Sequence, residues 1–188
     1  SFGGDNSITA GAGNNLIQLS LALAGNDEVL AGDGNNQIET FGGNDRIEVG
    51  NGLNTVNAGA GDDVVITGDG PNLVIGGAGE DEVTLGDAVG TLNVVDAGTE
   101  NDVVIGGDSR DVVFGGAGDD TITTGLGDDA ANGDADNDVI STGAGNDVAN
   151  GGAGDDIIDT GPGLDQAIGG TGADRLVPGL NQDTIAFT

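Results

Sequence analysis

The chain of 188 residues contains no cysteine, no histidine and only three lysine and arginine residues together. Without cysteine no disulfide can form, and without histidine or cysteine neither a zinc site nor a nucleophile–base pair of the usual kind can be assembled. A net charge of −30 excludes nucleic acid as a natural partner and favours cations. The sequence therefore predicts a cation-binding protein that is not an enzyme.

Long apolar segments are missing as well. No run of about 18 apolar residues occurs, which predicts that the chain does not insert into a membrane. No basic segment followed by an apolar one begins at Ser1, so we expect no leader of that kind in this sequence.

Glycine is abundant, at 40 of 188 residues, and it recurs in a nine-residue unit. Two clear copies are GAGDDTITT from Gly116 and GAGDDIIDT from Gly152. Twenty such units follow one another from Phe2 to Phe187, with three extra residues at 20–22 and again at 95–97. Tandem repeats of fixed period indicate one small unit stacked on itself. We therefore expect a single solenoid domain over residues 1–188.

The seventh residue of every unit is aliphatic, as at Val65, Leu92 and Ile122. A helical period of 3.6 is absent, and glycine recurs too often for helices. Each unit is therefore expected to hold one short strand with a single inward side chain. Two units would make one coil, which predicts an all-β parallel β-roll or β-helix solenoid of about ten coils, spaced at roughly 4.8 Å.

The fifth residue of most units is Asp or Asn, and it follows two glycines. Glycine permits a tight turn and a close approach of backbone carbonyls to a ligand. A carboxylate beside such carbonyls makes an all-oxygen site, which suits Ca²⁺. Because aligned carboxylates repel one another without cations between them, we expect folding to require the metal.

Successive units alternate between two edges of the solenoid, so the fifth residues fall into two columns. One column begins at Asn6 and continues with Asp27, Asp45, Asp63, Asp81, Asp102, Asp120, Asp138, Asp156 and Asp174. The other begins with Asn15, Asn36, Asn54, Asn72 and Gly90 and continues with Asp111, Asp129, Asp147, Asp165 and Asp183. These fourteen aspartates are the predicted calcium ligands.

The asparagine half of the second column has two interpretations. The side-chain amides can hydrogen-bond to one another along the rod, or Asn can merely tolerate the turn conformation. Acidic residues at the fourth position are interpreted chiefly as solvated side chains, with added metal ligands as the alternative: Asp62, Glu80, Asp119, Asp128 and Asp155.

The units GAGDDVVIT from Gly59, GAGDDTITT and GAGNDVANG from Gly143 resemble the calcium-binding repeats of the repeats-in-toxin (RTX, hemolysin-type) proteins. The resemblance covers nearly the whole chain. It implies a β-roll with Ca²⁺ held between successive turns of one edge by Asp carboxylates and glycine-turn carbonyls. It also implies export from a bacterium and folding outside the cell.

Two functions remain open. The first is a calcium-stiffened extracellular structural protein that associates end to end in a filament, surface layer, matrix or adhesin. The second is a folding and secretion module of a larger exoenzyme or toxin. Units begin at Phe2 and end at Phe187 without a polar cap, which favours stacking of chain ends. Outward apolar pairs suggest a lateral contact surface, unless a neighbouring loop covers them: Val64 and Ile66, Leu73 and Ile75, Val103 and Ile105, Val112 and Phe114.

Overall fold

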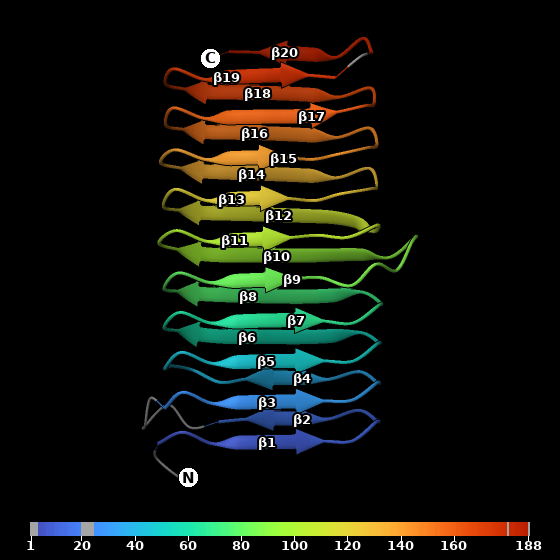
Figure 1. Cartoon of the computed structure of the whole chain (residues 1–188), viewed down its shortest axis with the longest axis vertical. Coiled ribbons are helices and arrows are strands. Elements are labelled where there is room, and N and C mark those ends of the chain that lie inside the picture. Colours follow the sequence, from blue (N-terminus) through green and yellow to red (C-terminus); the bar gives the residue numbers. More distant parts are fainter. Residues whose placement is uncertain (1–3, 20–24, 180, 188) are drawn as a thin grey trace.

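The computed structural model describes residues 4–19, 25–179 and 181–187. Within them the chain forms strands and turns, and the strands belong to two parallel sheets of ten strands each (Figure 1). The odd sheet holds β1 (Ser7–Ala10), β3 (Glu28–Ala31), β5 (Arg46–Val49), β7 (Val64–Thr67), β9 (Glu82–Thr84), β11 (Val103–Ile105), β13 (Thr121–Thr123), β15 (Val139–Ser141), β17 (Ile157–Gly161) and β19 (Arg175–Pro178). The even sheet holds β2 (Leu16–Gln18), β4 (Gln37–Glu39), β6 (Asn54–Ala60), β8 (Asn72–Ala78), β10 (Leu92–Thr99), β12 (Arg110–Ala117), β14 (Ala130–Ala135), β16 (Val148–Ala153), β18 (Gln166–Thr171) and β20 (Thr184–Ala186).

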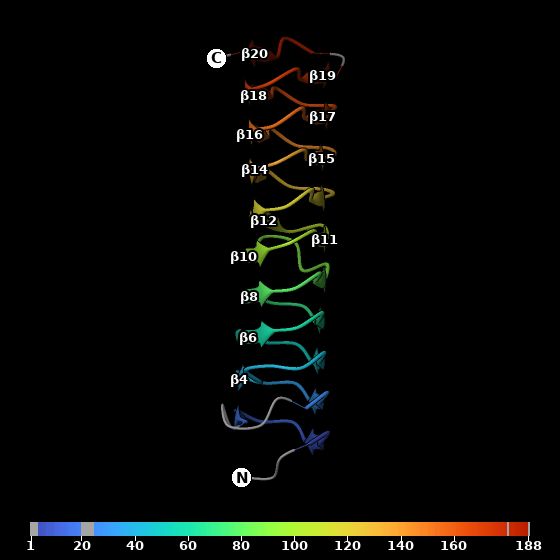
Figure 2. The same ribbon diagram turned by 90° about the vertical axis from the view of Figure 1, so that its left-hand side faces the viewer.

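Two nine-residue units make one coil. The chain runs through one odd strand, turns, runs back through one even strand and then begins the next coil (Figure 2). Val65 of β7 therefore lies beside Val83 of β9 rather than beside a residue of β8. The predicted parallel β-solenoid of about ten coils is confirmed.

The glycines of the turns allow the coils to stack closely. Gly61 has a φ of 121°, a conformation that residues with a Cβ rarely adopt. A Cβ at this position would also collide with the carbonyl group of Gly43 in the coil below. Here and throughout, "below" means toward the N-terminus, as the rod is drawn in Figure 1. Each turn thus lies directly on the turn of the preceding coil.

The core is a file of aliphatic side chains between the two sheets. Ile47 and Val65 of the odd sheet and Val56 of the even sheet are fully buried. In the upper coils the odd sheet contributes isoleucines and the even sheet alanines, so the two sheets fill the core unequally: Ile122, Ile140 and Ile158 against Ala131, Ala149 and Ala167.

The second insertion does not lie at 95–97, so the sequence-based frame is wrong there. Val95 pairs with Val74 and is fully buried, which makes it the seventh residue of its unit. Leu92, the predicted core residue, is 43% exposed. The extra residues instead lengthen the turn between β9 and β10, which projects from the rod in Figure 1. A longer turn leaves the ladder of hydrogen bonds intact, whereas extra residues inside β10 would interrupt it.

The first insertion was predicted at 20–22, a segment that lies outside the described residues. Ile8 pairs with Val29, and Ile17 pairs with Ile38. Coil-to-coil contacts here join residues 21 apart, against 18 in most other coils. Three extra residues therefore lie between Ile17 and Val29.

Candidate metal centres

The fifth-position residues stand in the turns, in two columns along opposite edges. We call the turns that precede odd strands the odd-strand edge, on the left in Figure 1, and those that precede even strands the even-strand edge. Twelve of the fourteen predicted aspartates are buried, and the two at the top, Asp174 and Asp183, are half-buried. The structure therefore brings the predicted residues together as two continuous columns.

One oxygen of each carboxylate joins two coils. The backbone N–H of Asp45 donates to Oδ1 of Asp63 over 2.7 Å, and that of Asp63 donates to Oδ1 of Asp81 over 2.8 Å. The same bond recurs on the even-strand edge, where Asp129 donates to Oδ1 of Asp147 over 2.9 Å. Each aspartate that lies between two coils thus accepts from the coil below and donates to the coil above, and the uppermost, Asp174 and Asp183, accept only.

The second oxygen of these carboxylates is buried without a hydrogen-bond partner. A buried carboxylate oxygen in this state is costly unless a cation or a proton accompanies it. The unpaired Oδ2 atoms belong to Asp45, Asp63, Asp81, Asp102, Asp120, Asp129, Asp138, Asp147, Asp156, Asp165, Asp174 and Asp183.

Backbone carbonyls supply the remaining oxygens. On the even-strand edge the side-chain amide of Asn36 donates to the carbonyl oxygens of Gly32 and Gly34, over 3.0 and 3.2 Å. These are the first and third residues of the unit, and they direct their carbonyls at the fifth side chain. In a unit with Asp at the fifth position, a carboxylate Oδ2 atom replaces this amide group. The Oδ2 atom and the carbonyl oxygens of the first and third residues are then all acceptors. Such a set of oxygens fits a hard cation such as Ca²⁺.

Glycine at the end of a unit also makes room for these oxygens. A Cβ on Gly133 would collide with Oδ2 of Asp138 and would lie 2.7 Å from the carbonyl oxygen of Gly151 in the next coil. No group of three or more acidic side chains converges on one point anywhere in the described part of the chain. An ion here must therefore take many of its ligands from the backbone.

Comparison with family models decides what these repeats are. The model of the RTX calcium-binding nonapeptide repeat matches residues 2–19, 21–56, 57–92, 96–131, 132–167 and 151–185. The chain belongs to the RTX calcium-binding repeat family. It accordingly binds Ca²⁺ at multiple sites, as its buried aspartates require. A search among curated proteins finds no match.

Burial raises the pKa of most aspartates in the RTX columns. Loss of hydration is the main cause, neighbouring carboxylates add to it, and the hydrogen bond from the coil below partly opposes it. The pKa rises to about 7 at Asp63, Asp102 and Asp138. It rises to about 6 at Asp81, Asp120, Asp129 and Asp147. Protons and Ca²⁺ therefore compete for the same oxygens near neutral pH.

The asparagines of the even-strand edge form the ordered amide ladder. Each side-chain amide donates to Oδ1 of the Asx residue one coil above, over 2.7 Å from Asn15 to Asn36 and 2.8 Å from Asn36 to Asn54. Gly90, predicted as the fifth residue of its unit, is not part of this ladder. Asn93 takes that place and accepts from Asn72, because the extra residues precede β10.

A second ladder at the fourth position was not predicted from the sequence. Asp62 accepts a hydrogen bond from the backbone N–H of Glu80 over 3.0 Å, and Asp119 accepts one from Asn137 over 2.8 Å. These side chains are exposed, as expected, but they join coils in the direction opposite to the fifth-position ladder. The recurrence of Asp and Asn at the fourth position is the sequence signal from which this ladder could have been predicted.

The predicted lateral surface divides between two faces of the RTX solenoid. Val64, Ile66, Val103 and Ile105 lie on the odd sheet, whereas the other four lie on the even sheet. On the even sheet Leu73, Val94 and Val112 stand side by side in successive coils.

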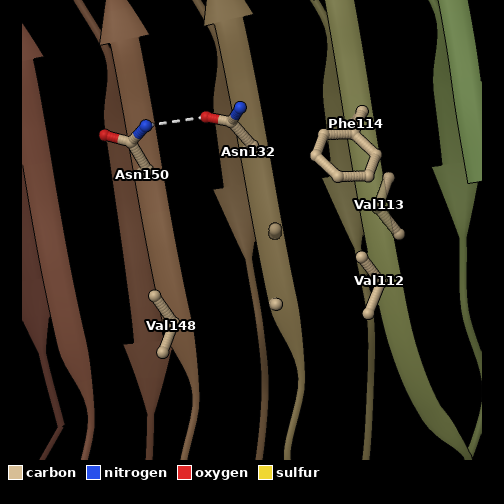
Figure 3. Close-up of a pocket in the computed structure, with 8 residues that line it drawn as sticks. Val112, Val113, Phe114, Asn132, Val148 and Asn150 are labelled. Carbon is tan, nitrogen blue, oxygen red and sulfur yellow. Dashed lines mark hydrogen bonds between the residues drawn. The ribbon is translucent and has the colours of Figure 1, made fainter.

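Phe114 borders a hollow on the even sheet. The hollow measures about 140 Å³ and lies beside Val112, Val148, Asn132 and Asn150 (Figure 3). The small side chain of Ala130 stands there between Val112 and Val148 of the neighbouring coils. Among the described residues no helix could cross a membrane.

Proposed function

We propose that the chain is an extracellular structural rod that Ca²⁺ stiffens and that associates end to end. The supporting observation is that both ends of the described solenoid present open strand edges. Within the described residues, β1 and β2 at one end and β19 and β20 at the other pair on one side only. Open parallel strands of this kind can accept a further coil.

The polarity of the fifth-position ladder is the same along the whole rod. At the lower end the side-chain amides of Asn6 and Asn15 donate to the coil above, so by the same repeat their Oδ1 atoms would accept from a lower coil. At the upper end Asp174 and Asp183 accept at Oδ1 from the coil below, so by the same repeat their own N–H groups would donate to a further coil. An upper end placed on a lower end would continue both ladders. Such a head-to-tail contact does not close on itself and generates a filament.

At the fifth position the first coil carries amides and not carboxylates on both edges, Asn6 and Asn15. Asn6 donates to the carbonyl oxygen of Gly4 and to Oδ1 of Asp27, both over 2.7 Å, as the asparagines of the even-strand edge do. A joint between two rods would therefore add less negative charge than an internal contact between two aspartate coils. This lowers the electrostatic cost of association for a protein of net charge −30.

The metal ligands in this proposal are the fourteen aspartates of the two columns, together with carbonyl oxygens of the glycine turns. Twelve of them have a buried, unpaired Oδ2 atom. All-oxygen calcium sites of extracellular modules have dissociation constants of roughly 10⁻⁴–10⁻³ M. Such affinities match the calcium concentration outside cells, which supports an extracellular location. Lateral contact through the even-sheet face around Leu73, Val94 and Val112 could bundle the rods.

Electron microscopy of the purified chain in millimolar Ca²⁺ and in chelator tests this function. We expect filaments with Ca²⁺ and none with chelator. Fusion of a compact domain to either terminus should reduce the filaments to single rods. The matched control inserts the same domain at Val89, which is 81% exposed in the long turn between β9 and β10 and should leave filaments intact.

Discrete rods of the unmodified chain in Ca²⁺ would contradict end-to-end association. That outcome would favour the second function, a calcium-dependent folding and secretion module of a larger protein, in which further chain covers the terminal strands. Ordered particles that persist in chelator would contradict metal-dependent folding itself.

A further inference from the structure

The even-strand edge changes its chemistry half-way along the rod. From Asn15 to Asn93 its fifth-position side chains are amides, and from Asp111 upward they are carboxylates. We propose that in the lower half the side-chain amide takes the place of the calcium ion, so that this half-edge is a seam that needs no metal. The inference rests on calcium binding by the aspartate columns and not on end-to-end association.

Asn54 illustrates the geometry. Its Nδ2 atom donates to the carbonyl oxygens of Gly50 and Gly52, over 3.0 and 3.2 Å, and to Oδ1 of Asn72 over 2.9 Å. The amide group thus lies among three oxygens that belong to two successive coils. Asn36 and Asn72 repeat the arrangement with the corresponding glycines. A neutral donor at the centre of these oxygens leaves no vacant position for a cation and no carboxylate charge to attract one.

The opposite edge of the same coils provides an internal comparison. Asn54 and Asp63 are fifth residues of neighbouring units, and both are buried, at 0% and 1% exposure. Both polar atoms of the Asn54 side chain are hydrogen-bonded, with Oδ1 accepting from Asn36 and Nδ2 donating, whereas Oδ2 of Asp63 has no partner. Because fold and burial are the same, the side chain alone decides whether an ion is required. The lower coils therefore demand a cation on one edge only.

The transition from amide to carboxylate is itself satisfied by hydrogen bonds. Asn93 donates to Oδ1 of Asp111 over 2.9 Å, and the backbone N–H of Gly107 approaches Oδ2 of Asp111 at 3.3 Å. Among the described fifth-position residues of this edge, unpaired buried oxygens begin at Asp129. Asp111 thus closes the amide seam, and the first ion demanded by an unpaired oxygen on this edge lies at Asp129.

Native mass spectrometry of the full chain, which counts the bound Ca²⁺ ions in the folded protein, tests the seam. Asn54→Asp should bind one ion more than the unmodified chain, because a carboxylate oxygen replaces the donor among the same carbonyls. Asp63→Asn, at the same height on the opposite edge, should bind one ion fewer, because the new amide can donate to the carbonyls of Gly59 and Gly61. The two variants differ from the unmodified chain by one atom type at equally buried positions.

An unchanged ion count in folded Asn54→Asp would overturn the proposal, as would an unchanged count in Asp63→Asn. If Asn54→Asp fails to fold even in millimolar Ca²⁺, the Asp63→Asn count still decides.

The unmodified chain supplies a further measurement by hydrogen exchange during a Ca²⁺ titration. Backbone amides of β6 should gain protection at lower Ca²⁺ than those of β16, and the reverse order would overturn the seam. None of these readouts depends on filament formation, so failure of end-to-end association would leave them interpretable.

Discussion

The backbone N–H of Asp63 donates to Oδ1 of Asp81 over 2.8 Å, while Oδ2 of Asp81 is buried without a partner. One carboxylate therefore has two separate tasks. One oxygen joins two coils, and the other is available to a metal ion.

Substitutions at Asp81 should separate these tasks. Asp81→Asn keeps the Oδ1 acceptor and replaces Oδ2 by a donor, so we expect the fold to persist in Ca²⁺. Asp81→Ala removes both oxygens and leaves the N–H of Asp63 unpaired, which should cost about 1–3 kcal/mol of unfolding free energy relative to Asp81→Asn. Urea unfolding in millimolar Ca²⁺ measures the difference. Equal stability of the two variants would mean that the inter-coil hydrogen bond contributes little.

The raised pKa values predict opposite pH dependences with and without metal. In the metal-free fold, burial raises the pKa of Asp63 and Asp102 from 3.8 to about 7. Protons thus bind the folded state more tightly than the unfolded state, so this stabilising contribution is complete below about pH 4 and is lost as pH rises to about 7. In chelator, the β-sheet signal in circular dichroism should grow on acidification. Calcium affinity should instead fall over the same range, because the ion needs ionised carboxylates.

If the metal-free chain gives the same β-sheet signal at about pH 8 and about pH 5, the predicted stabilisation by protons is wrong. Calcium titrations with an equal midpoint at both pH values would contradict the predicted fall in calcium affinity. The two measurements are independent, since only one contains metal.

The crowded glycine at Gly133 predicts a sharp effect of one methyl group. Gly133→Ala should destabilise the calcium-bound fold by about 1–3 kcal/mol, because its Cβ would collide with Oδ2 of Asp138 and approach the carbonyl of Gly151. Gly11→Ala is the matched control, since a Cβ there meets no atom within 4 Å. Thermal unfolding in Ca²⁺ compares them. A Gly133→Ala variant as stable as Gly11→Ala would mean that the oxygens near Gly133 can move apart.

Because Val95 and not Leu92 is the core residue of β10, substitutions at these two residues should have unequal effects. Val95→Ala removes buried methyl groups and should cost about 2 kcal/mol of unfolding free energy. Leu92→Ala should change stability little, since Leu92 is 43% exposed. Chemical denaturation of both variants in Ca²⁺ provides the test, and the opposite order would restore the frame read from the sequence.

Much of the fold follows from the repeat itself. A constant step of nine residues with an aliphatic seventh position places Val65 and Ile122 in the core, and both are buried there. The nine-residue frame predicted the wrong core residue at Leu92. Leucine is as aliphatic as valine, and glycines occur both before and after the extra residues, so neither residue type marked the shift. Asn93, two residues before Val95, carried the missing information, since every other unit of this edge has Asn or Asp two residues before its core residue.

The hydrogen-bond direction of each column could not be predicted in the same way. Whether Asp62 points to the coil above and Asp63 to the coil below depends on how one turn rests on the next. That is a property of the stacked coils and not of one unit. The burial that leaves Oδ2 of Asp63 unpaired likewise arises only once neighbouring coils cover it.

The division of the even-strand edge has a mechanical consequence. Under tension along the axis, coils of a solenoid detach one after another from an end, since each coil contacts only its neighbours. Coils that are bridged by ions on both edges should resist such peeling more strongly in Ca²⁺ than coils bridged on one edge. In Ca²⁺ the rod would then yield first near its amide-lined end. Chelation would reverse this order, because the amide-lined coils keep their seam while the upper coils lose the ions of both edges. Its toughness is thus graded along its length by the choice between Asn and Asp at single positions.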